Sequence, residues 1–161
     1  METSVGTVTL RRMHFIDMPL VLAWRSDKEV TKYMPSAPAD PTWDSQISWW
    51  DSNDQRRKPH FIVEVGNRIT ARPVGVVHLV CDTGEVGIYI GERSLWSKGI
   101  GTVALELLAQ EASRLTELPL RALVHRDNNR SKKLFASCGY TCDGATGRNG
   151  QLVYVLKRAD K

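Results

Sequence analysis

A glycine-containing turn carries the clearest chemical signal in this sequence. Residues 96–102, Trp-Ser-Lys-Gly-Ile-Gly-Thr, lie between a β-branched run and a long helical pattern. Glycine lets the backbone approach a ligand closely, and the free N–H groups at the start of a helix attract phosphate oxygens. The segment therefore predicts an anion-binding turn, with a tight turn that binds nothing as the other interpretation. It is neither a P-loop nor a dinucleotide-binding motif, because the Gly-Lys-Ser/Thr group and the third glycine are absent.

The distribution of charge also favours an anionic ligand. The 161 residues include 22 basic and 18 acidic side chains, which gives a formal net charge of +4. Residues 121–161 contain nine of the basic and three of the acidic side chains, so this quarter is strongly basic and the remainder is slightly acidic. Zinc-finger spacings and aromatic RNA-binding signatures are absent. We therefore expect a phosphorylated small molecule rather than nucleic acid.

Hydrophobic periodicity predicts the elements that must position this turn. Helical spacing predicts helices over residues 18–25, 43–51, 99–115 and 128–138, with a further short turn of helix over 27–33. Alternation and short apolar runs predict strands over residues 5–13, 60–65, 73–81, 85–91, 120–124, 140–142 and 151–157. This order, with one β-α-β crossover, predicts an α/β fold in which helices flank a mixed sheet. The crossover helix begins at the carboxyl end of the 85–91 strand, where ligands tend to bind in open sheets.

Length and composition indicate a single globular domain over residues 1–161. Hydrophobic residues make up 42% and charged residues 25%, values that exclude fibrous and disordered classes. No apolar run approaches the roughly 20 residues of a membrane span, and no secretory signal pattern opens the sequence. Cysteines 81, 138 and 142 show no metal-ligand pairing. We expect a cytoplasmic protein with reduced thiols, no metal and no membrane partner.

A second motif, N-x-x-S-x-x-L-F-x-x-x-G-Y, occupies residues 128–140. Together with Glu85 on a strand and the turn at 96–102, it resembles the GNAT superfamily of acyl-CoA N-acyltransferases, most clearly over residues 73–140. The resemblance implies a mostly antiparallel sheet of about seven strands with about four helices, and acetyl-CoA as the co-substrate. Trp96 stands where the family usually has Arg or Gln. Trp is familiar there in a subgroup that resembles ribosomal-protein N-terminal and nucleotide-amino-sugar acetyltransferases.

The resemblance implies that acetyl-CoA binds mainly to residues 85–140. In the family, the pantetheine arm pairs along the strand before the turn as an added strand would, and the turn binds the pyrophosphate through backbone N–H groups. The residues expected to contact acetyl-CoA are Tyr89, Ile90, Gly91, Lys98, Gly99, Ile100, Gly101, Thr102, Asn128 and Ser131. Basic side chains between residues 126 and 133 either meet the CoA phosphates or form a solvated helix face.

Proton transfer defines the expected catalytic residues. An amine is mostly protonated at pH 7 and must lose a proton before it attacks a thioester. Glu85 lies 11 positions before the turn, where some family members have a catalytic glutamate, so we expect it to be the base; a solvent-facing glutamate is the other interpretation. Phe135 replaces the tyrosine that commonly protonates the leaving thiolate. Ser131 or a bound water is the expected substitute, and Tyr140 is expected to pack.

The acceptor is expected to bind mainly to residues 14–60. Residues 24–34, W-R-S-D-x-x-V-x-x-Y-M, resemble a segment of bacterial N-acetyltransferases that act on nucleotide-linked aminodeoxysugars. The residues assigned to the acceptor are Trp24, Arg25, Tyr33, Trp49 and, as a secondary candidate, His78. Arg25 suits an anionic acceptor, and the aromatic rings suit a sugar or base, although core packing is the other interpretation of these aromatics.

These observations predict an N-acetyltransferase acting on a primary amine of a small polar metabolite, with a nucleotide-linked amino sugar as the first choice. N-terminal acetylation of a protein is the alternative among enzymes. An aminoglycoside is disfavoured because a polycation would need an acidic pocket and this chain is net basic. A CoA-binding domain without turnover is the alternative of another class, which Phe135 leaves open. We expect a monomer or a homodimer.

Overall fold

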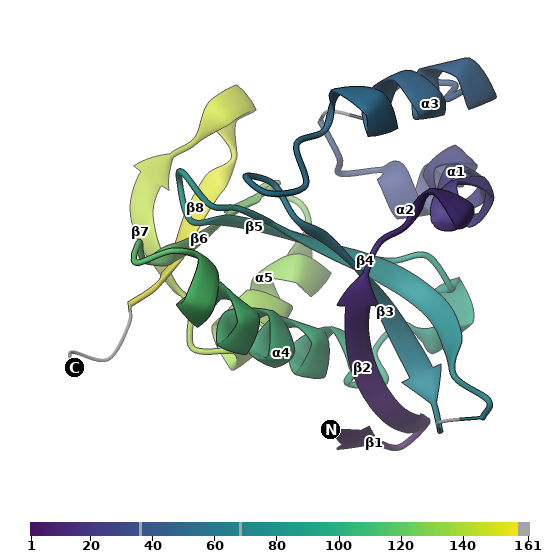
Figure 1. The fold of residues 1–161 in the computed structure, drawn as a ribbon. Helices are drawn as coiled ribbons and strands as arrows, with labels where there is room; N and C mark the ends of the chain where they lie inside the picture. Colours follow the sequence, from purple (N-terminus) through teal and green to yellow (C-terminus); the bar gives the residue numbers. More distant parts are fainter. Residues whose placement is uncertain (36, 68, 158–161) are drawn as a thin grey trace.

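A single sheet organises the chain, in a computed structural model that describes residues 1–35, 37–67 and 69–157. Residues 158–161 of the expected domain therefore lie outside the described part. Within the described residues the sheet has eight strands, in the order β1-β2-β3-β4-β5-β6-β8-β7 (Figure 1). The strands are β1 (Glu2–Thr3), β2 (Gly6–Arg12), β3 (His60–Gly66), β4 (Arg72–Val80), β5 (Glu85–Ile90), β6 (Leu120–Val124), β7 (Thr141–Thr146) and β8 (Leu152–Leu156). All neighbouring strands are antiparallel except β5 and β6, which confirms the expected mixed, mostly antiparallel sheet.

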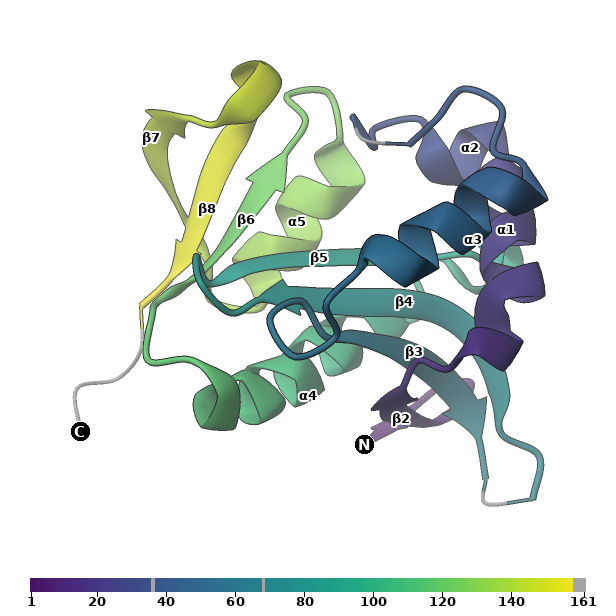
Figure 2. The same ribbon diagram turned by 45° about the horizontal axis from the view of Figure 1, so that its top comes forward.

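Helices cover both faces of the sheet (Figure 2). Within the described residues the α-helices are α1 (Met18–Ser26), α2 (Lys28–Thr31), α3 (Trp43–Ser52), α4 (Ile100–Leu115) and α5 (Asn129–Ser137). Three short 3-10 turns accompany them, η1 (Phe15–Asp17), η2 (Arg93–Leu95) and η3 (Arg148–Gly150). The first three α-helices lie on one face of the sheet, and α4 and α5 lie on the other.

Alternation along the central strands divides the side chains between these two faces. The β4 residues Val77 and Leu79 join the large core under α4, where they meet the apolar stripe of that helix. Val76 points to the opposite face, into a smaller core with residues of α1. His78 has the same parity as Val76 and therefore lies on the face that carries α1, α2 and α3. The alternation thus separates a structural face from a face that can present polar groups.

The sheet opens between β5 and β6. These two strands, both wholly described, pair at a single position, where Glu85 lies opposite Arg121. Beyond it β6 turns away and pairs along its whole length with β8, as Figure 2 shows. The β6-facing backbone groups of β5 after Glu85 are therefore left without a strand partner.

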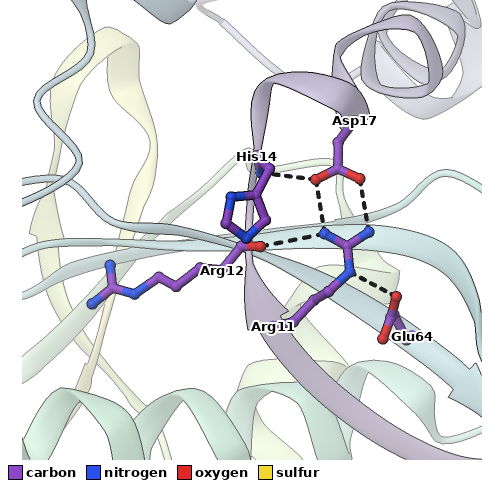
Figure 3. Close-up of polar contacts among 5 residues, drawn as sticks. All are labelled: Arg11, Arg12, His14, Asp17 and Glu64. Carbon is purple, nitrogen blue, oxygen red and sulfur yellow. Dashed lines mark hydrogen bonds and ion pairs between the residues drawn. The ribbon is translucent and has the colours of Figure 1, made fainter. Parts of the chain in front are cut away.

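A polar network, which we call the α1 clamp, ties the start of α1 to the sheet (Figure 3). Arg11 donates through Nη1 and Nη2 to the Asp17 carboxylate at 2.8 and 2.7 Å, and through Nε to Glu64 Oε1 at 2.7 Å. The backbone N–H of His14 donates to the same Asp17 carboxylate at 2.9 Å. Burial raises the pKa of Asp17, but the hydrogen bonds from Arg11 and His14 outweigh it, so the pKa lies below its ordinary value. The α1 clamp thus holds the start of α1 against β2 and β3.

Candidate active site

A cavity of about 980 Å³ occupies the opening between β5 and β6. It has walls from both faces of the sheet, because the strands separate there. From the face of α1–α3 it is lined by Arg25, Trp49, Lys58, His60, His78, Glu85 and Tyr89. From the face of α4 and α5 it is lined by Ile88, Ile100, Leu134 and Phe135. The volume falls within the roughly 300–1,000 Å³ that is usual for small-molecule sites.

The N-terminus of α4 contributes hydrogen-bond donors to this cavity. The first backbone bond of the helix runs from the Val103 N–H to the Gly99 carbonyl at 3.2 Å, so the N–H groups of residues 100–102 have no acceptor in the described part of the chain. Residues 99–102 all line the cavity. Gly99 has a φ of +81°, which favours glycine, and a Cβ at Gly101 would lie 3.1 Å from Leu134 Cδ2. The backbone conformation therefore explains the glycine at position 99, and the close approach of Leu134 explains the glycine at position 101.

Trp96 joins the end of β5 to the start of α5. Its Nε1 donates to the Ile90 carbonyl at 2.7 Å, and the guanidinium of Arg130 lies over its ring at 3.5 Å. Trp96 and Arg130 both line the cavity beside the N-terminus of α4. The residue that departs from the family pattern thus positions a cation next to the free N–H groups.

Asn128 and Ser131 lie together at the start of α5. The Asn128 side chain accepts a hydrogen bond from the Ser131 N–H at 3.1 Å and so caps the helix. Both residues line the cavity. The Asn128 Nδ2 and the Ser131 hydroxyl have no partner among the described residues, so both groups are free to meet a ligand.

Two histidines lie side by side on the face of α1–α3. His60 and His78 are opposite each other on β3 and β4, their rings stack at 5.0 Å, and Trp49 contacts His60 edge-to-face at 5.0 Å. The His60 Nδ1 lies 2.9 Å from the Lys58 carbonyl and 3.4 Å from Asn53 Nδ2. The shorter contact is to an atom that can only accept, so we assign the proton to this nitrogen. Burial lowers the pKa of His78 to about 4, with a smaller contribution from Lys58, and burial together with His78 lowers the pKa of His60 well below its ordinary value. Both rings are therefore neutral at pH 7.

Glu85 lies at the closed end of the opening and lines the cavity. Its Oε1 lies 2.7 Å from Arg148 Nη2, and its Oε2 lies 3.8 Å from Arg121 Nη2. Both carboxylate oxygens are thus engaged with arginines. The assignment of Glu85 as the base stays a prediction, and the structure adds these two partners to it.

Arg25 and Tyr33, which we expected at the acceptor, and Tyr89, which we expected to contact acetyl-CoA, all line the cavity. Arg25 donates to Gln46 Oε1 at 3.3 Å and lies 5.7 Å from the centre of the Trp49 ring. Tyr33 contacts the ring of His125 at 5.0 Å, which joins the acceptor wall to the loop before α5. Burial raises the pKa of Tyr89, so its hydroxyl stays protonated.

Three expected site residues do not line the cavity. Trp24 is 4% exposed and packs in the core under α1, where its Nε1 donates to Glu92 Oε1 at 3.2 Å. Gly91 is buried beneath Trp24, whose ring fills the space that a Cβ at this position would need. Lys98 is exposed on the turn. Trp24 is therefore corrected from an acceptor contact to a core residue, as the other interpretation of the aromatics had it.

Phe135 is buried and contacts Tyr140 edge-to-face at 5.1 Å. Burial raises the pKa of Tyr140, and its hydroxyl has no hydrogen-bond partner in the described residues. Tyr140 does not line the cavity, although Phe135 does. The packing role expected for Tyr140 agrees with this placement.

Sequence reasoning missed His60, Lys58 and Arg148. His60 could have been found from the predicted hairpin, because residues equidistant from its turn pair across it, and His60 is the partner of His78. Arg148 reaches Glu85 across 63 residues, and no local pattern signals such a contact.

The described residues contain neither a helix with the length and hydropathy of a membrane span nor a group of three or more metal-ligating side chains. The three cysteines are free. Burial raises the pKa of Cys81 and of Cys138, so both remain thiols at neutral pH. None of the three lines the cavity.

Comparison with known proteins gives the class of this chain. A family model described as an acetyltransferase (GNAT) domain matches residues 7–141. The chain therefore belongs to the GNAT acetyltransferase domain family.

The similar proteins agree with this class. An uncharacterized protein of Methanocaldococcus jannaschii is 31% identical over 152 residues, which cover 92% of this chain and 31% of the relative, so the chain spans about a third of that protein. A crystal structure of a domain from Methanocaldococcus jannaschii has a TM-score of 0.85 at 28% identity and covers 94% of this chain and 98% of that domain. An aminoglycoside acetyltransferase in complex with coenzyme A has a TM-score of 0.79 at 17% identity, covering 92% of this chain and 93% of that one. These structures confirm the predicted GNAT fold.

Proposed function

We propose that this chain transfers the acetyl group of acetyl-CoA to a primary amine of a small anionic metabolite, with a nucleotide-linked amino sugar as the first acceptor to test. One observation carries the proposal. One cavity joins the free N–H groups of the α4 N-terminus, on one face of the sheet, to an acceptor wall that carries Arg25 and Lys58 on the other face.

The residues on the α4 side fit acetyl-CoA, which supplies an acetyl group activated as a thioester. The N–H groups of residues 100–102 and the Arg130 guanidinium suit the pyrophosphate. The unpaired edge of β5 suits the amide groups of the pantetheine arm, which would add as a strand does. Asn128 Nδ2 and the Ser131 hydroxyl offer further polar contacts, and Ser131 stays our candidate for the group that meets the leaving sulfur.

The charge of the cavity favours an anionic acceptor. Its charged lining residues are the cations Arg25, Lys58, Arg130, Lys133 and Arg148 and the anions Glu29 and Glu85. Glu85 is paired with Arg148 and Arg121, and Arg130 and Lys133 lie on the α5 side. The unpaired charges on the acceptor side are then Arg25 and Lys58 against Glu29, a net positive charge. Solved relatives include enzymes named for aminoglycosides and, from Vibrio cholerae, for spermidine, which are polycations. The cations of this cavity would repel such substrates and attract the diphosphate of a nucleotide-linked sugar.

The contact between Tyr33 and His125 favours a small acceptor over a protein N-terminus. These residues come from opposite walls of the cavity and meet at 5.0 Å. A contact between the two walls obstructs the extended groove that a peptide needs. Trp49 and Tyr33 offer rings on which a sugar or a base can stack.

Thiol release from acetyl-CoA across a panel of amines tests this proposal. The panel contains UDP-glucosamine, a dTDP-linked 4-amino-4,6-dideoxy sugar, a ribosomal-protein N-terminal peptide, spermidine and kanamycin. We expect the highest kcat/KM for a nucleotide-linked amino sugar, and no turnover with UDP-N-acetylglucosamine, which is the matched control without a free amine. A higher kcat/KM for spermidine or kanamycin would contradict the charge argument, and CoA binding without any turnover would favour a binding domain.

A further inference from the structure

His78 lines the cavity where the wall from the face of α1–α3 meets the wall from the face of α4 and α5. It is opposite Gly87 of β5, and a Cβ at Gly87 would collide with its ring. The ring therefore covers β5 two residues after Glu85, where the sheet opens. The other titratable or charged side chains that line this part of the cavity are Arg25 of α1, Lys58 before β3, His60 of β3, and Glu85 and Tyr89 of β5.

Both ring nitrogens of His78 are free of hydrogen bonds to the residues that the structure describes. The side chain is half-buried and lines the cavity, so these nitrogens face the cavity and are not sealed in the core. The stacked His60 keeps the ring in place, and its own Nδ1 is held by the Lys58 carbonyl. The ring of His78 is thus fixed in position while its nitrogens remain available.

The other groups that could move a proton here are less suited. Ser131 has a free hydroxyl at the cavity, but an alcohol is too weak a base to take the proton of the acceptor nitrogen. Both oxygens of Glu85 face arginines, with Arg148 Nη2 at 2.7 Å and Arg121 Nη2 at 3.8 Å. Phe135 has no proton to give, and Tyr140 does not line the cavity. Tyr89 also lines this part of the cavity, but burial raises the pKa of its hydroxyl, which cannot take a proton from nitrogen. His78 is the group here that can both take and return one.

We propose that His78 carries the proton that must pass from the acceptor nitrogen to the leaving sulfur; this inference rests on the acetyl transfer proposed above. The acceptor arrives as a free amine. Its lone pair forms the N–C bond, and the nitrogen then gives one proton to the imidazole. The C–S bond breaks with its electron pair on sulfur, and the imidazolium returns the proton to the thiolate, so that His78 ends as it began.

The low basicity of His78 suits this relay. An imidazole with a pKa of about 4 stays neutral at pH 7 and cannot strip a free ammonium, but a nitrogen bonded to an acyl carbon is far more acidic than an ammonium. The imidazolium that forms is a strong acid toward a thiolate, whose conjugate acid has an ordinary pKa of about 8.5. One residue can therefore replace both a strong base and the missing tyrosine.

Substitution and chemical rescue test the relay. The variants are His78→Gln, which keeps a polar side chain, and His78→Ala, which leaves a hole above Gly87 for added imidazole. His14→Gln is the matched control, because His14 is exposed and lies outside the cavity. The probe is UDP-glucosamine, or the best amine of the panel above. Calorimetry with CoA and NMR titration of the His78 ring give readouts that do not depend on turnover.

We expect both His78 variants to lose about 10²-fold or more in kcat, which is within the usual range for a positioned proton-transfer group. CoA affinity should stay within about twofold, His14→Gln should match the wild type, and imidazole should restore His78→Ala at least about tenfold. The ring of His78 should titrate below pH 5 in the free protein. Wild-type kcat in His78→Gln, or a loss in CoA-competent His78→Ala that imidazole does not restore, overturns the relay. A wild type that turns over no amine contradicts the proposed function instead.

Discussion

Two groups of polar side chains lie on the face of the sheet that carries α1, α2 and α3, and they are built in opposite ways. In the α1 clamp, Arg11, Asp17 and Glu64 are charged and meet at 2.7–2.8 Å, with each charge paired. In the histidine pair, His60 and His78 are neutral, and the nitrogens of His78 have no partner in the described residues. The α1 clamp packs at the start of α1, outside the lining of this cavity, whereas His60 and His78 line the cavity.

This difference separates stability from function. A satisfied ionic network contributes through the cost of breaking it, because removal of one partner leaves a buried charge alone. An unsatisfied group beside a cavity contributes little to folding and remains available to a ligand. The two clusters therefore predict opposite responses to mutation.

The largest effect is expected from Arg11→Met in the α1 clamp. It leaves the buried Asp17 carboxylate without its bidentate partner, so the free energy of unfolding should fall by about 3 kcal/mol. Urea unfolding at pH 7 measures it. Arg11→Met combined with Asp17→Asn should recover part of the loss, because the orphaned charge is gone. An Arg11→Met protein as stable as the wild type would show that the α1 clamp does not contribute to stability.

Gly101→Val should weaken CoA binding by about 2 kcal/mol, or roughly 30-fold, because the added methyl groups must displace Leu134 or the start of α4. Calorimetry with CoA measures the change. Gly101→Ala is the control, since its single Cβ meets only the flexible end of Leu134 and should cost less. Unchanged CoA affinity in Gly101→Val would contradict the assignment of this turn to CoA binding.

Acid should destabilise the protein through Asp17. Its pKa is lowered in the folded state, so the clamp contributes its full stability above the unfolded pKa of about 3.9 and loses it as pH falls through the folded pKa. Urea unfolding between pH 6 and pH 3 should show this loss in the wild type. In Asp17→Asn the slope over the same window should be shallower, and equal slopes would assign the acid sensitivity to other carboxylates.

Arg25→Ala should raise the KM of an anionic acceptor about tenfold, the loss expected for one charge-assisted hydrogen bond, with CoA affinity nearly unchanged. Steady-state kinetics with the nucleotide-linked sugar measure it. Arg25→Lys keeps the charge and should recover part of the KM. A matching loss of CoA affinity would show that Arg25 acts mainly through its hydrogen bond to Gln46.

The smallest effect on stability is expected from His78→Phe. Phe replaces a neutral ring that has no hydrogen bond to lose, so the free energy of unfolding should stay within about 1 kcal/mol of the wild type or rise. Turnover should nevertheless fall steeply. A loss of stability as large as that of Arg11→Met would mean that the histidine pair is structural, and the comparison would break.

Local periodicity explains which parts of the fold could be predicted. The stripe of α4 and the alternation of β3, β4 and β5 are strong within single windows, and the structure contains each of these elements. β1 was missed because two residues, Glu2 and Thr3, show no period, and β7 extends to Thr146 because its pairing with β8 prolongs it. Both differences arise from long-range or very short pairing.

The site was predictable only where a motif carries it. The turn at 96–102, apart from Lys98, and the pair Asn128 and Ser131 line the cavity, because their positions follow from the helices that they begin. Trp24 could not be separated from Arg25 in advance, because which side of a short helix is buried depends on its partners. The partners of Glu85 and the stacking of His60 on His78 depend on strand register and on a C-terminal turn, and neither is visible locally.

The single pairing between β5 and β6 should also appear in deuterium exchange. Amide protons of β5 that face β4 are protected by a full ladder, whereas those that face the gap beyond Glu85 have no strand partner. In the free protein the second group should exchange with solvent much faster than the first, although both belong to the same strand. A ligand that adds its own amides to this edge would slow only the second group, so exchange rates residue by residue along β5 would trace the length of the ligand that the sheet accepts.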